Sequence, residues 1–180
     1  MMSISVFLSY PKPYVKRQQE FVEKLNVYLR GRGFSPRTLG VTDYDMDAPL
    51  TAIRRLMLES NGLITIAFRR AFIEKGIGKP NGDIGQDSYD ISNNWMTSPY
   101  SHIEPAMAFQ IGLPILIFRE DGVIAEGILE QGVTGLYMPE FNLDKQINYF
   151  DTLEWTQVIG RWEGHVRSVV QNKGCPPKLY

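Results

Sequence analysis

The sequence is poor in the residues that close disulfides and hold metal ions. Its 180 residues include one cysteine, Cys175, and two histidines, His102 and His165. A single cysteine cannot close a disulfide within the chain, which is typical of a reducing compartment, so we expect a cytoplasmic protein. These three residues also leave little material for a zinc site. The segment His102-Ile103-Glu104 has the H-x-E of zinc deaminases, but no P-C-x-x-C accompanies it. We therefore expect no bound metal.

Long apolar runs are also missing. The longest, at residues 62–68 and 113–118, have the length of a strand, whereas a membrane-spanning helix needs about 18 apolar residues. The first residues, Met1-Met2-Ser3-Ile4-Ser5, lack the basic start and apolar stretch of a signal peptide. We expect no membrane partner.

Neither sign of charge dominates. Nineteen Lys and Arg face 20 Asp and Glu, for a formal net charge of -1 and a pI near 6.1. This balance lacks the basic excess of a dedicated nucleic-acid binder, so no nucleic-acid partner is expected. Hydrophobic residues make up 43% of the chain, which excludes general disorder and favours one globular domain.

Apolar periodicity predicts strands and helices in alternation, the pattern of an α/β fold with a doubly wound parallel sheet. Pro36 places its strand at an edge of that sheet, because proline cannot donate to a central ladder. We expect one domain over residues 1–172, with a long insertion at about 69–97 and a tail at 173–180. The expected strands are 4–9, 34–39, 63–68, 113–118 and 135–138. The expected helices are 15–30, 49–60, one from about 99 or 104 to 111, 123–129 and 153–170.

Several catalytic motifs are absent. The sequence contains neither G-x-x-x-x-G-K-[ST] nor G-x-S-x-G, and Gly76-Ile77-Gly78 does not join a strand to a helix as a dinucleotide fingerprint does. The central strand ends in Phe68-Arg69-Arg70 and offers no phosphoacceptor aspartate. These features exclude the common phosphate-binding and nucleophilic-serine sites.

One acidic residue stands where ligands bind in such sheets. Glu104 lies between the long insertion and an apolar helix, at the mouth of the predicted sheet. It could serve only as the last member of a capping box, Ser101-x-x-Glu104. Pro105 weighs against that box, since proline there removes an early intrahelical hydrogen bond. A catalytic carboxylate and a structural cap both remain open from the local sequence.

Two segments resemble the boxes of the Toll/interleukin-1 receptor (TIR) domain family. Val6-Phe7-Leu8-Ser9-Tyr10 is similar to the first box, and Ser98-x-Tyr100-x-x-x-Glu104 is similar to S-x-W-x-x-x-E, with Tyr100 in place of the usual tryptophan. The order of elements from Ile4 to about Val170 also matches the five-stranded flavodoxin-like TIR architecture. A chain of this size is similar to the stand-alone TIR proteins of Thoeris-like anti-phage defence.

The resemblance implies an enzyme. It makes Glu104 the catalytic residue that cleaves the nicotinamide–ribose bond of NAD, giving ADP-ribose or a cyclic or conjugated ADP-ribose signal. NAD would be a substrate, with no separate cofactor. Nicotinamide leaves as a neutral base, so one carboxylate suffices where glycosidases need a pair. The substrate-binding residues that it implies are Phe7, Ser9, Tyr10, Asp45, Ser98 and Tyr100.

The resemblance also implies partners, namely self-association through TIR surfaces and a separate effector protein that receives the product. The insertion at residues 69–94 would be a lid that excludes water. Phe7 equally suits a core strand position, and acidic loops such as the one that holds Asp45 are usually only solvated.

Two other interpretations stay open. The segment from Ser101 to Ala108, followed by Gly112-Leu113-Pro114-Ile115, also suits a nucleoside 2-deoxyribosyltransferase-like enzyme, in which the glutamate attacks the sugar covalently. A non-catalytic TIR adaptor is the third, and a glutamate at position 104 disfavours it.

Overall fold

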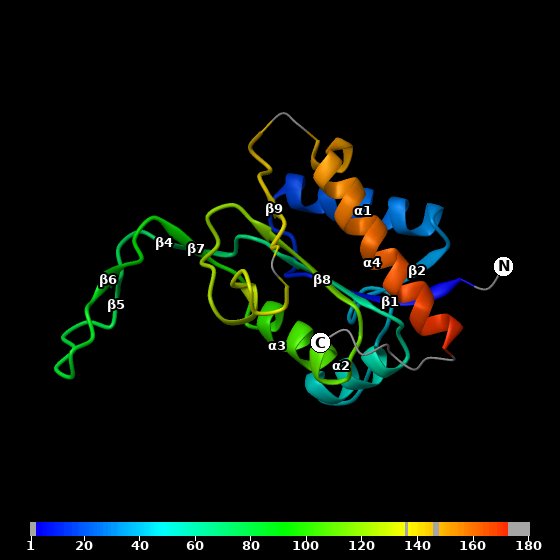
Figure 1. The fold of residues 1–180 in the computed structure, drawn as a ribbon, viewed down its shortest axis with the longest axis horizontal. Helices are drawn as coiled ribbons and strands as arrows, with labels where there is room; N and C mark the ends of the chain where they lie inside the picture. The colour runs from blue at the N-terminus through cyan, green and yellow to red at the C-terminus, as the bar shows by residue number, and fades with distance from the viewer. Residues whose placement is uncertain (1–2, 136, 146–147, 173–180) are drawn as a thin grey trace.

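The computed structural model describes residues 3–135, 137–145 and 148–172, and its core is a five-stranded parallel sheet (Figure 1). The strands lie in the order β2-β1-β3-β8-β9, so the chain winds first to one side of β1 and then to the other. This is the flavodoxin-like, doubly wound α/β fold that the sequence predicts. The strands are β1 (Ile4–Ser9), β2 (Phe34–Arg37), β3 (Leu63–Ala67), β8 (Ile115–Glu120) and β9 (Glu140–Phe141).

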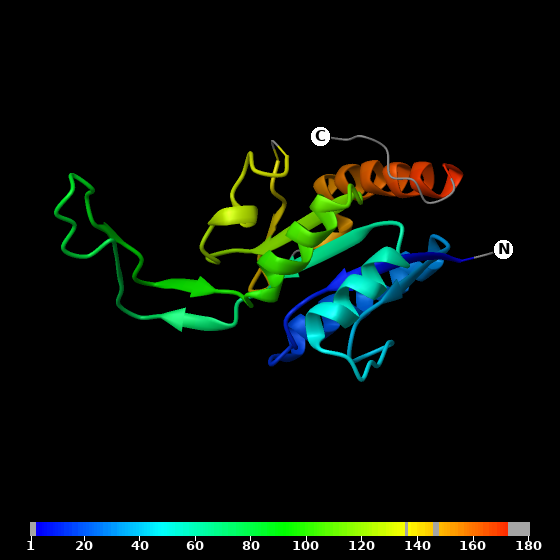
Figure 2. The same cartoon turned by 90° about the horizontal axis from the view of Figure 1, so that it is seen from below.

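Helices cover both faces of the sheet. The helices α1 (Lys16–Gly31) and α4 (Leu153–Gln171) pack on one face, and α2 (Pro49–Leu58) and α3 (Tyr100–Gln110) pack on the other (Figures 1 and 2). All five residues of β3 are buried, as expected of a central parallel strand. No helix in the described part of the chain is long and apolar enough to cross a bilayer.

Alternate residues of β1 point to opposite faces, as they do in any strand. Val6 and Leu8 join the core cluster beneath α1 and α4. Phe7 joins the cluster beneath α2 and α3, and Ser9 follows it on that face. This alternation decides which β1 side chains can meet α3.

Helix α3 begins at the earlier of the two starts that the sequence allows. It runs from Tyr100 and contains Pro105, so regular bonding does not start at the proline. The backbone N–H groups of His102 and Ile103 both donate to the carbonyl of Pro99, at 3.0 and 3.1 Å. Pro105 therefore interrupts only one bond of a turn that is already closed. As a result, Glu104 lies inside the helix and not at its boundary.

The last strand also differs from its expected place. Residues 135–138 were predicted as a strand, but β9 lies at Glu140–Phe141 and residue 136 is outside the described residues. The expected helix at 123–129 is a short 3-10 turn at Gly127–Leu129, and a second such turn lies at Tyr149–Asp151.

Most of the insertion after β3 forms an antiparallel arm that extends away from the sheet (Figures 1 and 2). Its inner pair is β4 (Ala71–Ile73) with β7 (Asn94–Met96), and its outer pair is β5 (Ile77–Gly78) with β6 (Tyr89–Asp90). At its root, the Arg69 guanidinium lies 3.1 Å from Asp144 and 5.7 Å from the ring centre of Trp95. These contacts fix the base of the arm.

Candidate active site

Glu104 lies at the edge of the sheet where β1 and β3 end. The strand order reverses between these two strands, and open α/β sheets bind ligands at such a switch point. The glutamate is 8% exposed and lines a cavity of about 340 Å³. The other residues around that cavity come from the end of β1 and the loop after it, the loop before α2, helix α2, and the start of α3 with the residues just before it: Ser9, Tyr10, Pro11, Lys12, Leu39, Pro49, Ile53, Ser98, Tyr100 and Ser101.

Ser9 and Glu104 meet across 95 positions of sequence. Ser9 is the last residue of β1 and is 3% exposed, and its hydroxyl donates a hydrogen bond to Oε2 of Glu104. This contact requires that Ser9 share the face of Phe7, beneath α3. A hydrogen bond to an ionised carboxylate is among the stronger ones in proteins, so it holds the carboxyl group in one orientation.

Burial raises the pKa of Glu104 from 4.5 to about 7, and the hydrogen bond from Ser9 opposes that shift. No charged side chain among the described residues contributes to the shift. The carboxyl group is thus balanced between its neutral and ionised forms near neutral pH. Such a group can act as a base, a nucleophile or an electrostatic partner for a developing cation.

Two tyrosines flank the cavity. Tyr10 follows Ser9, and desolvation raises the pKa of its phenol. Tyr100 is the first residue of α3 and is 40% exposed. Aromatic rings at a cavity wall offer flat apolar surfaces to a base or a sugar.

The capping box that the sequence left open does not form. The Ser98 hydroxyl accepts a bond from the backbone N–H of Tyr100 at 3.3 Å, while the Ser101 hydroxyl lies 3.3 Å from that of Thr97. Neither serine bonds to Glu104 in the described structure, so the glutamate is held from β1 and not by its own helix. This arrangement removes the structural-cap interpretation of Glu104.

Five of the seven residues that the sequence suggests for the site lie around this cavity: Ser9, Tyr10, Ser98, Tyr100 and Glu104. Phe7 does not line it, and is 1% exposed within the core beneath α2 and α3. Asp45 does not line it either. Its carboxylate lies 2.6 Å from Arg55 and accepts a bond from the backbone N–H of Asp47, and these contacts lower its pKa.

Sequence reasoning missed the basic residue of the cavity, Lys12, and the apolar wall formed by Leu39, Pro49 and Ile53. Lys12 lies two residues beyond Tyr10 in the loop after β1, a position at the carboxyl end of a strand that could have singled it out. Pro49 and Ile53 reach the cavity through the packing of α2, and Leu39 reaches it from the loop after β2. Within the described ranges, no group of three His, Cys, Asp or Glu is placed to hold a metal ion.

Comparisons with known proteins do not identify a family for this chain. No family model matches the chain, and no curated protein matches it. Among solved structures, a CMP N-glycosidase from Clostridium botulinum aligns with a TM-score of 0.47 and 18% identity over 83% of this chain and 98% of its own. FerB, an NAD(P)H:acceptor flavoenzyme from Paracoccus denitrificans, aligns with a TM-score of 0.35 and 13% identity over 95% and 96%. At these scores neither likeness assigns a function to this chain.

Proposed function

We propose that the protein is an enzyme that cleaves an N-glycosidic bond in a nucleoside or nucleotide, with Glu104 acting at the sugar. The observation that carries the proposal is the buried Glu104 carboxyl, which Ser9 orients toward a cavity at the switch point of the sheet. A carboxylate in a desolvated cavity interacts strongly with positive charge. The sugar of a nucleoside develops such charge when its base departs.

In this reaction Glu104 acts in its ionised form. It can stabilise the oxocarbenium-like sugar while water attacks, or it can bond to the sugar and be displaced in a second step. Ser9 holds one carboxylate oxygen, which leaves the other free to face the sugar. The aromatic rings of Tyr10 and Tyr100 provide surfaces against which the base or ribose can pack.

NAD is the substrate that we propose first. Glu104 is the only carboxyl group among the described residues that line the cavity. Among these residues there is therefore no second carboxylic acid to protonate a leaving base. Nicotinamide needs no such acid, because it departs from NAD as a neutral molecule. Cleavage in the manner of TIR enzymes would give ADP-ribose or a cyclic or conjugated derivative, which a separate effector in anti-phage defence would receive.

A deoxyribosyl nucleoside is the second candidate. The raised pKa of Glu104 makes its ionised form a better nucleophile than an ordinary carboxylate, and this favours a covalent bond to the sugar. A cavity of about 340 Å³ lies at the small end of the range for ligand sites, which suits a single nucleoside.

Incubation with each substrate class tests the proposal. The full chain is incubated separately with NAD and with the four deoxynucleosides, and the free bases and sugar products are separated and identified by mass spectrometry. Release of nicotinamide supports the first candidate, and release or exchange of a nucleobase supports the second. If no base is released from any of them, the proposed function is wrong.

Replacing Ser9 with alanine should shift the pH dependence of cleavage. The Ser9 hydroxyl stabilises the ionised carboxylate and lowers the pKa of Glu104, so its loss should move the midpoint of the pH–rate profile upward. A hydrogen bond to a charged group is worth a free energy that corresponds to about one pH unit. The measurement is base release as a function of pH in the wild type and the variant.

Ser101→Ala is the matched control. Ser101 lines the same cavity and is 1% exposed, but its hydroxyl pairs with Thr97 and not with Glu104. Its midpoint should stay with that of the wild type. Equal midpoints in Ser9→Ala and the wild type would show that the Ser9 bond does not control the ionisation of Glu104.

A further inference from the structure

A second cavity lies on the other side of the segment that leads into α3. It encloses about 510 Å³ and shares no lining residue with the Glu104 cavity. Residues 96–104 serve both: Ser98, Tyr100, Ser101 and Glu104 face one cavity, and Met96, Thr97, Pro99, His102 and Ile103 face the other. The opposite wall of this second cavity is the chain that follows β8, at Ile124, Glu126 and Gly127.

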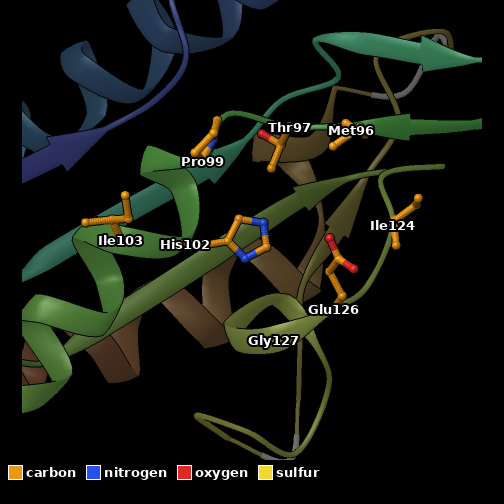
Figure 3. A pocket seen from close by; sticks show the side chains of 8 residues that line it. All are labelled: Met96, Thr97, Pro99, His102, Ile103, Ile124, Glu126 and Gly127. Carbon is orange, nitrogen blue, oxygen red and sulfur yellow. The ribbon is translucent and has the colours of Figure 1, made fainter. Parts of the chain in front are cut away.

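Two ionisable side chains project into this cavity. Figure 3 shows the imidazole of His102 and the carboxylate of Glu126 reaching into the same space from facing walls. Within residues 3–135, 137–145 and 148–172, neither side chain forms a hydrogen bond or an ion pair. A Cβ atom at Gly127 would lie 3.7 Å from Nδ1 of His102, so the glycine leaves the space beside the imidazole open. Both groups are thus available to a ligand.

The remaining walls are largely apolar. Met96, Ile103 and Ile124 line the cavity together with Pro99, and Met96 and Ile103 are 49% and 37% exposed. Ligand sites commonly combine such walls with a few polar groups that fix orientation. A flat ring could pack against these side chains with its polar edge toward His102 and Glu126.

The Glu126 carboxylate determines which nucleobase can bind with its polar edge in this cavity. An ionised carboxylate only accepts hydrogen bonds. Cytosine and adenine present an exocyclic amino group, whereas uracil presents a carbonyl oxygen at the same place. Glu126 therefore favours a base with an amino group and repels one with a carbonyl oxygen. The cavity volume leaves room for the ribose as well as the base.

We propose that this second cavity binds a nucleoside whose base carries an exocyclic amino group. The role of this nucleoside in catalysis rests on the proposed function. It would be either the acceptor of the sugar or the adenosine half of a dinucleotide substrate, held across the start of α3 from Glu104. The binding itself does not depend on that function.

The test is calorimetric titration of the full chain carrying Glu104→Gln, which prevents turnover from confusing the signal. Cytidine and adenosine should bind about fivefold or more tightly than uridine. Glu126→Gln should abolish that preference, because a glutamine amide both donates and accepts. His102→Ala should weaken the binding of all three nucleosides.

Tyr100→Ala distinguishes the two cavities, since Tyr100 lines only the Glu104 cavity. Cytidine affinity should survive this substitution. The proposal is overturned if no nucleoside binds, if Glu126→Gln leaves the cytidine–uridine ratio unchanged, or if Tyr100→Ala alone removes binding. If NAD competes with cytidine for this cavity, the natural ligand is the adenosine half of a dinucleotide. If NAD does not compete, the natural ligand is a free nucleoside. Either result supports the site.

Discussion

Replacing Glu104 with glutamine is expected to lower the rate of base release by about a thousandfold or more. Glutamine keeps the size of the side chain and can still accept the hydrogen bond from Ser9, but it cannot carry a negative charge. The developing positive charge on the sugar then has no anionic partner in the cavity, because Glu104 is the only carboxyl group among its described lining residues. The measurement is chromatographic quantification of free base over time.

The same variant should fold as well as the wild type. Burial raises the pKa of Glu104 to about 7, so the folded state favours the protonated carboxyl, and its stability falls as the pH rises from about 4.5 through 7. Glutamine is neutral throughout. At pH 8 the variant should therefore be at least as stable as the wild type toward urea. A folded Glu104→Gln protein with full activity would remove Glu104 from the mechanism.

Replacing Phe7 with alanine should lower the free energy of unfolding by about 3 to 5 kcal/mol. Phe7 is 1% exposed and packs among Ile53, Leu56 and Met57 of α2 and Ala108 of α3. Truncation removes a large buried ring and leaves a cavity that the neighbouring helices fill only in part. Urea unfolding, followed by circular dichroism, measures the difference.

Phe72→Ala is the matched control. Phe72 lies in β4 of the arm, is 50% exposed, and packs on Trp95 at a centroid distance of 5.0 Å. Its truncation should cost about 1 kcal/mol or less, because half of the ring is already in water. If Phe7→Ala left stability unchanged and weakened substrate binding instead, Phe7 would belong to the site that the sequence resemblance suggests.

The sequence was most informative where periodicity and strand ends decide the structure. Pro36 correctly predicts an edge strand, since β2 is the outermost strand of the sheet. The carboxyl ends of parallel strands meet at one edge, and this rule brings Ser9 into the neighbourhood of Glu104 although 95 positions separate them.

What the sequence could not predict depends on tertiary contacts. The sequence allowed α3 to start at about residue 99 or at 104, and only the structure shows the bonds from His102 and Ile103 to Pro99 that close its first turn at the earlier start. The insertion has no clear period, and its pairing into an arm is visible only in the structure. The ion pair between Asp45 and Arg55 is likewise visible only in the structure.

The most direct test of the central claim is the pH dependence of base release by the wild-type protein. If the ionised Glu104 carboxylate drives cleavage, kcat/KM should rise with pH, reach half of its maximum near the carboxyl pKa of about 7, and level off above it. A rate that stays flat or falls between about pH 5.5 and 8.5 would contradict that role for Glu104.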